Sequence, residues 1–231
     1  MKPFFYHKLK AKQALRGRAG KSALVAVFMT FLTLFVNMYL SVIFKDNVKL
    51  NLIAELVITA FVIIPFTMGK SLFFMSFLDP ELKVSVASMM DGYKYIIKLI
   101  PYIILELLLS VGVYFVSLRL PPVIDINAQI PFETRLIVTA TVAVVAIVKL
   151  LTSFTTYILC EDNKISGFKA LIKSIKLTFP RFFYIVGLTF SFMLWYFLIP
   201  LTSGLIVLYL IPYTELTMIM LYKDITEEKG C

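Results

Sequence analysis

Long apolar runs with few charges are the feature that most limits what this chain can fold into. The first extends from Ala23 to Phe44 without an Asp, Glu, Lys or Arg residue. A helix needs ~20 apolar residues to cross the ~30 Å hydrocarbon layer of a membrane, and this run is long enough. The sequence therefore predicts an all-α membrane protein with about six transmembrane helices. The expected spans are 23–44, 51–77, 95–118, 136–158, 182–201 and 205–221.

The composition agrees with a membrane protein and excludes two other classes. Of the 231 residues, 60% are hydrophobic and 16% are charged, against about 45–50% and roughly 25% in soluble domains. Disordered chains have low hydrophobicity and few aromatic residues, whereas this chain has 21 Phe and 12 Tyr. We therefore expect a single polytopic membrane domain over 1–231, with a basic N-terminal segment at 1–22 and a tail at 222–231.

The distribution of positive charge predicts the orientation in the membrane. Segments rich in Lys and Arg are retained in the cytoplasm. With the N-terminus inside, most of the 23 Lys and Arg residues fall on the cytoplasmic side. The residues expected outside are Lys45, Lys49, Arg119 and Arg135. We expect a multi-pass protein of the cytoplasmic membrane with both termini in the cytoplasm.

The stretch before the fifth span has the pattern of a helix that lies in the membrane interface. Its apolar residues recur at helical spacing: Ile165, Phe168, Ile172 and Ile175. Lysines run beside this stripe, so that their ammonium groups can reach the lipid headgroups. The residues expected to contact headgroups are Lys169, Lys173 and Lys176, with Arg16 and Arg18 of the N-terminal segment.

The stretches before the first and third spans carry weaker signals of the same kind. The third span follows a helix-start signal, Asp79-Pro80-Glu81. The run from Phe4 to Lys21 is basic, but its apolar and charged positions are mixed. We predict three helical hairpins, each preceded by a cytoplasmic basic or amphipathic interfacial helix. The alternative is that these basic stretches are ordinary cytoplasmic loops, because any six-span protein has basic loops on that side.

Ionisable residues inside the spans are the candidates for specific interactions. Each costs ~2.5–3.5 kcal/mol to insert, so it normally faces other helices and has a partner. Glu106 and Lys149 lie at similar depth, as do Lys70 and Glu215. We predict two intramembrane ion pairs, which either fix the helix register or form a proton or ion relay. Glu55 lies near the outer end of its span, where it can reach the headgroups.

Known catalytic constellations are largely absent from the sequence. Cys160 and Cys231 are too few and too far apart for a disulfide framework or a metal site. The single histidine, His7, stands in a basic run, and nothing beside it suggests contact with the membrane domain. No nucleotide-binding or zinc-protease motif occurs. We expect no catalytic residues, no metal, no cofactor and no enzymatic activity.

Motifs near both ends of the chain carry a resemblance to a known family. They are Ala11-Lys12-Gln13-Ala14-Leu15-Arg16-Gly17, Leu201-Thr202-Ser203-Gly204-Leu205, Ile211-Pro212-Tyr213 and Leu221-Tyr222-Lys223-Asp224. In these motifs and in its layout, the chain resembles the bacterial integral membrane proteins of the domain of unknown function 975 (YciC-like) family. The resemblance implies a multi-span protein with no established activity. Glu215 departs from the family pattern.

Two function hypotheses from different classes follow. The first is a non-enzymatic protein that acts through protein partners or lipid, as an accessory or envelope-maintenance component, and the missing catalytic motifs favour it. The second is a small transporter or channel for ions or small solutes, favoured by the intramembrane charges and by Pro65, where the second span should tilt or kink. An intramembrane enzyme has little support.

The expected partners follow from the same distribution of charge. Membrane lipids with anionic headgroups should contact the cytoplasmic side. A membrane-protein partner or a homo-oligomer is also compatible with the sequence. Nucleic acid is not needed to explain the formal net charge of +9.

Overall fold

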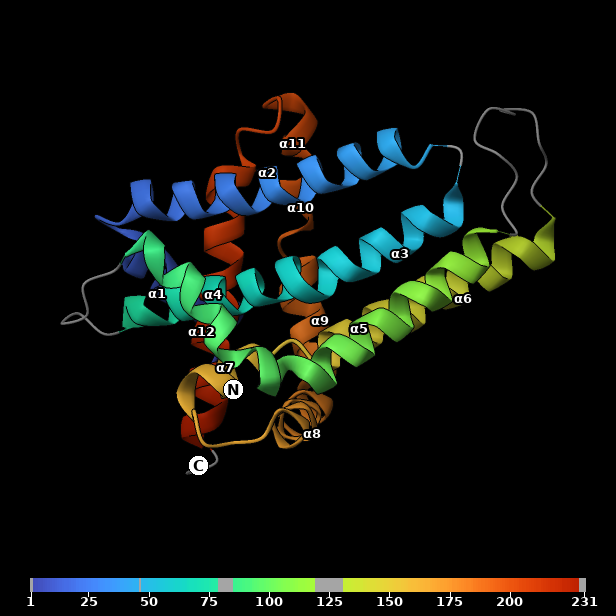
Figure 1. Ribbon diagram of the computed structural model, residues 1–231. Coiled ribbons are helices and arrows are strands. Elements are labelled where there is room, and N and C mark those ends of the chain that lie inside the picture. The colour runs from blue at the N-terminus through green and yellow to red at the C-terminus, as the bar shows by residue number, and fades with distance from the viewer. Residues whose placement is uncertain (1, 46, 79–84, 119–130, 229–231) are drawn as a thin grey trace.

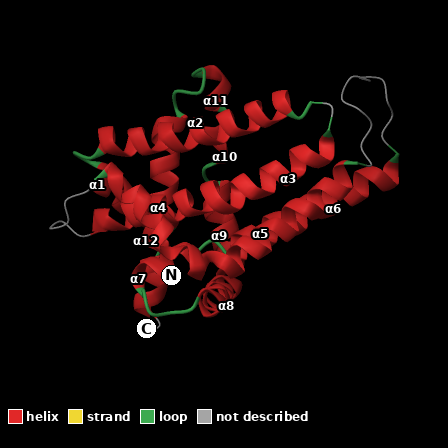
Figure 2. Cartoon of the chain, viewed as in Figure 1, coloured by secondary structure: helices red, strands yellow, loops and turns green. Residues whose placement is uncertain are grey.

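The described part of the computed structural model is built from helices and the turns that join them (Figures 1 and 2). The structure describes residues 2–45, 47–78, 85–118 and 131–228. The helix-start signal at 79–81, most of the segment between the third and fourth predicted spans, and Cys231 lie outside these ranges. Within the described ranges, five helices are long and apolar enough to cross a membrane: Ala19–Ile43, Val48–Leu78, Val86–Ser117, Phe132–Glu161 and Gly167–Leu201.

The first two long helices differ in their regularity. Helix α2 (Ala19–Ile43) is continuous. The second is divided into α3 (Val48–Ile58), a π-helical turn at Thr59–Ile63, α4 (Ile64–Met75) and a final 3-10 turn at Ser76–Leu78. Pro65 lacks an N–H group and its ring crowds the preceding turn, and the π-helical turn ends two residues before it. The distortion expected at Pro65 therefore lies in the turn that precedes it.

The third and fourth long helices are also interrupted. A 3-10 segment, η3 (Val86–Tyr95), leads directly into α5 (Ile96–Ser117). Helix α6 (Phe132–Leu151) is separated from α7 (Thr155–Glu161) by a turn. Ser174 stabilises this turn, because its hydroxyl donates to the Leu151 carbonyl at 2.8 Å and accepts from the Phe154 N–H at 3.2 Å. The predicted span 136–158 is thus two helices.

The fifth long helix begins with the stretch that the sequence assigned to the membrane interface. Helix α8 (Gly167–Thr178) continues through a 3-10 turn (η4, Phe179–Arg181) into α9 (Phe182–Phe190). Two short helices follow, α10 (Met193–Tyr196) and α11 (Leu198–Leu201). One face of α8 is buried against α5 and α7, and a second apolar stripe is exposed. The exposed residues of that stripe are Phe168, Ile172, Ile175 and Phe179.

The sixth predicted span, 205–221, is not among the five long apolar helices. It falls in α12 (Val207–Glu228), which also contains Glu215, Lys223 and Asp224. These charges are tolerated because α12 is packed against α1, α2 and α4. Ser203 and Gly204 both have positive φ values, 50° and 84°, in the tight turn between α11 and α12. In the view of Figure 1, α12 and α9–α11 cross the direction of α2 and α3 steeply.

The N-terminal helix α1 (Phe4–Leu15) is part of the packed core, contrary to what its mixed charge pattern suggested. Its buried residues His7, Ala11 and Leu15 lie on one face, which contacts α12. On the side of α9, the Phe4 ring meets the Tyr184 ring edge-on, with the centroids 4.6 Å apart. Nothing beside His7 in the sequence suggested contact with the membrane domain, but the structure buries it against α12.

Two glycines allow η3 and α4 to approach each other at the distance of backbone contact. A Cβ atom added at Gly92 would lie 2.0 Å from the Pro65 carbonyl oxygen, and one at Gly69 would lie 1.8 Å from the Met89 carbonyl oxygen. Small residues permit such close approach between helices in lipid. This contact fixes the start of α5 against the second long helix.

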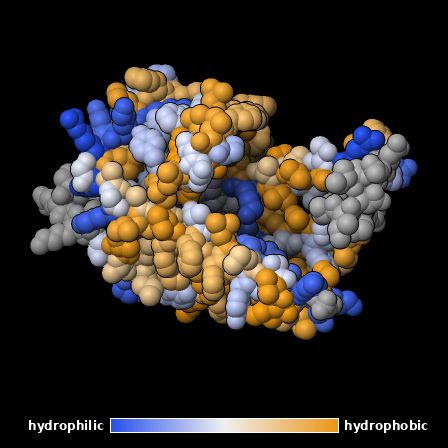
Figure 3. Space-filling view, turned by 90° about the horizontal axis from the view of Figure 1, so that it is seen from above, coloured by the Kyte–Doolittle hydropathy of each residue, from blue (hydrophilic) through white to orange (hydrophobic). Residues whose placement is uncertain are grey.

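Large apolar side chains remain exposed along the long helices, and they cover much of the face seen in Figure 3. On α2, for example, Phe31, Leu34 and Met38 are each more than 60% exposed. Extended apolar surface of this kind marks contact with lipid or with another protein. Together with the five long helices, it indicates a multi-pass membrane protein.

Candidate functional site

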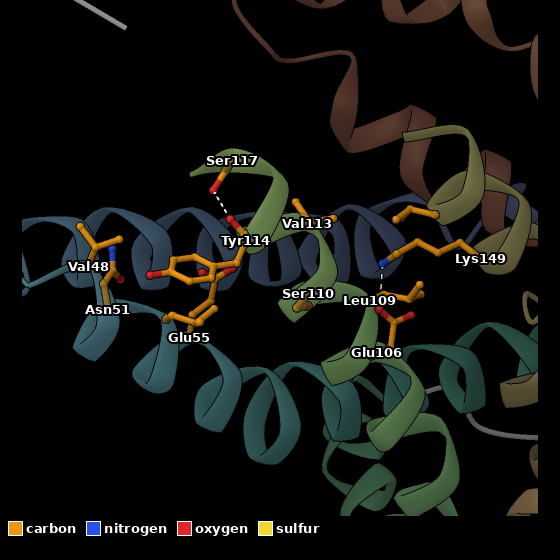
Figure 4. Close-up of a pocket in the computed structure, with 12 residues that line it drawn as sticks. Val48, Asn51, Glu55, Glu106, Leu109, Ser110, Val113, Tyr114, Ser117 and Lys149 are labelled. Carbon is orange, nitrogen blue, oxygen red and sulfur yellow. Dashed lines mark hydrogen bonds and ion pairs between the residues drawn. The ribbon is translucent and has the colours of Figure 1, made fainter. Parts of the chain in front are cut away.

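A polar pocket lies between α3, α5 and α6 (Figure 4). Its volume is about 340 Å³, which is within the size range of small-molecule sites. Apolar side chains such as Leu52, Leu109 and Val113 complete its walls. The polar and charged lining residues are Asn51, Glu55, Glu106, Ser110, Tyr114, Ser117 and Lys149.

The pocket exists because α3 and α5 each place polar residues on one face. Asn47 caps α3, accepting the Leu50 N–H at 3.1 Å, and Asn51 and Glu55 follow one turn apart. On α5 the polar residues of the pocket extend from Glu106 to Ser117 at helical spacing. At 1.5 Å per residue they cover about 16 Å of the helix. The pocket therefore runs from the end of α5 to its middle.

An ion pair lies at the end of the pocket that is near the middle of α5, its inner end. Lys149 Nζ is 2.9 Å from Glu106 Oε2, and the two residues come from α6 and α5. The Glu106 side chain is 11% exposed, whereas that of Lys149 is 56% exposed. The structure thus brings together the residues matched by depth in the sequence. Because the ammonium group is open to the pocket, it can meet a ligand there.

Glu55 occupies the wall of the pocket on α3. Figure 4 shows the Tyr114 ring extending from α5 toward α3, and both Tyr114 and Glu55 line the pocket. Among the described residues, Glu55 forms no ion pair and no side-chain hydrogen bond. The structure places Glu55, which the sequence suggested can reach the headgroups, in the lining of the pocket with Glu106 and Lys149.

The second predicted pair forms a separate and more enclosed cluster. Lys70 Nζ lies 2.6 Å from Glu215 Oε2, and the two side chains are 17% and 13% exposed. The Tyr157 hydroxyl donates to Glu215 Oε1 at 2.9 Å, so that both carboxylate oxygens have partners. Tyr102 interacts electrostatically with both Glu215 and Glu106. The Lys70–Glu215 cluster joins α4, α7 and α12 and has the character of a structural element.

Sequence reasoning did not find Tyr157 or Tyr102. Both residues were read as ordinary members of apolar spans. The available signal is that a buried tyrosine hydroxyl needs a hydrogen-bond partner, and the predicted spans contain only three carboxylates, Glu55, Glu106 and Glu215.

With the geometry established, comparison with known proteins assigns the family. Residues 1–229 match the family described as Protein of unknown function (DUF975). The chain belongs to this family. No curated protein and no solved structure matches the chain. The family assignment confirms the resemblance but names no activity. Any function of this DUF975 chain must therefore be inferred from its own residues.

A third polar cluster joins α1 to α12 in this DUF975 chain. Lys2 forms an ion pair with Asp224 Oδ1, and His7 Nε2 lies 3.7 Å from Asp224 Oδ2. His7 is almost fully buried, and neither ring nitrogen has a hydrogen-bond partner among the described residues. The sequence signal for this contact was the spacing of His7, Ala11 and Leu15 on one helical face.

The stability of the folded protein should fall as the pH is lowered past the ordinary pKa of His7. Burial lowers the pKa of His7 below its ordinary value of 6.5; nearby Asp224 opposes this shift, and Lys2 and Lys10 add to it. Near pH 6 the unfolded chain therefore binds a proton that the folded chain does not. We expect the unfolding temperature to fall between about pH 7.5 and about pH 5.5. The fall should be smaller in His7→Gln, and equal pH profiles would contradict this assignment.

The predicted headgroup contacts have different environments. Arg18 donates to the Phe77 carbonyl at 2.9 Å, and its guanidinium lies 5.1 Å from the Phe77 ring centroid. Arg18 therefore joins α2 to the 3-10 turn at Ser76–Leu78. Arg16, Lys169 and Lys176 are exposed, and Lys173 is partly buried.

Proposed function

We propose that the protein is a multi-pass protein of the cytoplasmic membrane that binds a small polar solute between α3, α5 and α6, as a transporter or channel does. The observation that carries this proposal is the polar pocket with the Glu106–Lys149 pair at its inner end and Glu55 on its wall. Charged residues within spans are costly and commonly mark substrate pathways. The π-helical turn that follows α3 agrees with the interrupted helices typical of transporters.

The proposed topology keeps the arrangement expected from the sequence. Three hairpins would be formed by α2 with α3–α4, by α5 with α6, and by α9–α11 with α12, and both termini would lie in the cytoplasm. Contacts of α2 with α3 and of α5 with α6 support the first two. Aromatic contacts support the third, since the Phe192 and Tyr213 rings lie 5.4 Å apart.

A second candidate function is a non-enzymatic accessory role through lipid or a protein partner. Its support is α8, where the exposed apolar stripe of Phe168, Ile172 and Ile175 runs beside the exposed Lys169 and Lys176. Such a helix can lie on an anionic membrane surface, with its lysines at the headgroups. The two functions are compatible, because α8 lies outside the pocket.

Flux measurements in liposomes test the transport function. The purified protein is reconstituted and supplied with radiolabelled cations, zwitterions, anions and neutral polyols. We expect flux of one class above protein-free liposomes, and a loss of about tenfold or more in Glu106→Gln, because the charge that Glu106 places in the solute pathway is lost. Glu133→Gln is the matched control, since Glu133 is exposed at the start of α6 and outside the pocket. Absence of flux for all classes would favour the accessory role instead.

A further inference from the structure

The charge of the pocket restricts the ligands that it can hold. Its ionisable lining residues, apart from tyrosine, are Glu55, Glu106 and Lys149. Glu106 and Lys149 neutralise each other at 2.9 Å. Glu55 has no charged partner in the part of the chain that the structure describes, so the described lining carries one net negative charge. The Glu55 side chain is exposed, so its carboxylate is accessible to a ligand, and a positively charged ligand would compensate its charge.

The surroundings of Glu55 suit an organic ammonium group. Tyr114 extends from α5 toward α3 (Figure 4), and its ring lines the same pocket as the Glu55 carboxylate. A cation held against a carboxylate and the face of an aromatic ring gains from both interactions. Asn51, one turn before Glu55, adds an amide oxygen on the same wall. The apolar walls at Leu52 and Val113 can contact the carbon atoms of such a ligand.

A bare metal ion fits this pocket less well than an organic cation. Cations such as Ca²⁺ require six to eight oxygen ligands in close contact. Among the described residues, no three His, Cys, Asp or Glu side chains are grouped so that they could hold a metal ion. The volume of about 340 Å³ also corresponds to a ligand of several non-hydrogen atoms.

We infer that the pocket between α3, α5 and α6 binds a small organic cation, with its ammonium group between the Glu55 carboxylate and the Tyr114 ring. This inference rests on the proposed solute-binding function and specifies its ligand class. The Glu106–Lys149 pair forms the inner end of the site, where the lysine ammonium disfavours a second positive charge. A monovalent cation is therefore the expected ligand.

Equilibrium dialysis with the detergent-purified full chain tests this inference. The probes are radiolabelled choline, glycine betaine, acetate and sodium. Choline should bind most tightly, and Glu55→Gln should weaken its binding about tenfold or more, because the charge that pairs with the ammonium is removed. Tyr114→Leu should weaken binding, whereas Tyr114→Phe should retain most of it, since the ring is kept. Glu133→Gln should bind choline as the unmodified protein does.

The possible outcomes separate the ligand class from the function itself. Glu55 has no partner in the described structure, so Glu55→Gln should fold, which an unchanged elution profile and unfolding temperature would verify. The cation assignment would be overturned if betaine or acetate bound more tightly than choline, or if Glu55→Gln left choline binding unchanged. Either result would leave the proposed solute-binding function intact. If no probe binds the folded protein and the liposomes show no flux, both proposals fail.

Discussion

Replacing Gly92 with alanine should sharply reduce the stability of the protein, because the added methyl group has no room. A Cβ atom there would lie 2.0 Å from the Pro65 carbonyl oxygen and 2.6 Å from the Gly69 backbone nitrogen. Overpacking against side chains typically costs ~1–3 kcal/mol. Here η3 and α4 would have to separate along their backbones, so we expect a loss at or above the upper end of that range. The unfolding temperature and the monodisperse fraction in detergent measure it.

The matched control for this substitution is Gly112→Ala on α5. A Cβ atom at Gly112 would meet nothing within 4 Å, and alanine is favoured over glycine within a helix. Gly112→Ala should therefore unfold at the same or a slightly higher temperature than the unmodified protein. Gly69→Ala should behave like Gly92→Ala, since it acts on the same contact. Equal unfolding temperatures for Gly92→Ala and Gly112→Ala would show that η3 and α4 do not approach so closely.

Breaking the Lys70–Glu215 cluster should produce the second large effect. Lys70→Met leaves the Glu215 carboxylate in an enclosed site with only the Tyr157 hydroxyl as a partner. Removing one member of a buried ion pair costs about 3–5 kcal/mol, because the remaining charge is uncompensated. Glu215→Gln should cost a similar amount by leaving Lys70 unpaired. The free energy of unfolding in mixed micelles measures both losses.

The double variant distinguishes a pair from two independent residues. Lys70→Met/Glu215→Gln removes both charges and retains an acceptor for Tyr157. Its loss should be clearly smaller than the sum of the single losses. Lys149→Met should cost less than Lys70→Met, because the Lys149 side chain is 56% exposed. Strictly additive losses at Lys70 and Glu215 would mean that the cluster does not act as a unit.

The sequence was most informative where membrane thickness constrains the chain. Runs of ~20 apolar residues have few structural solutions in lipid, so the long helices could be recognised, with ends shifted by several residues. Counting depth along those helices also matched Glu106 with Lys149 and Lys70 with Glu215, the residues that lie together in the structure. Depth along a helix is a local quantity, and it can be counted without knowledge of the packing.

Features that depend on packing between distant segments could not be obtained in this way. Predicting that Glu55 lines the pocket would require the angle between α3 and α5. The hydropathy pattern gives no information about that angle. The break between α6 and α7 depends on Ser174, which lies in another helix. The burial of α1 could not be predicted from its sequence, because lysines are interspersed with the apolar residues Ala11 and Leu15. Each of these features arises from contacts between residues far apart in the sequence.

The position of α1 imposes an order on the assembly of the protein during translation. Residues 4–15 are synthesised long before two of the residues against which they pack, Tyr184 on α9 and Asp224 on α12. These partners are synthesised about 170 to 220 residues later, and ribosomes add roughly 5–20 residues per second. The surface against which α1 packs is therefore completed only roughly 10–40 s after α1 itself has been synthesised. A segment that is synthesised early is therefore among the last to pack in its final position.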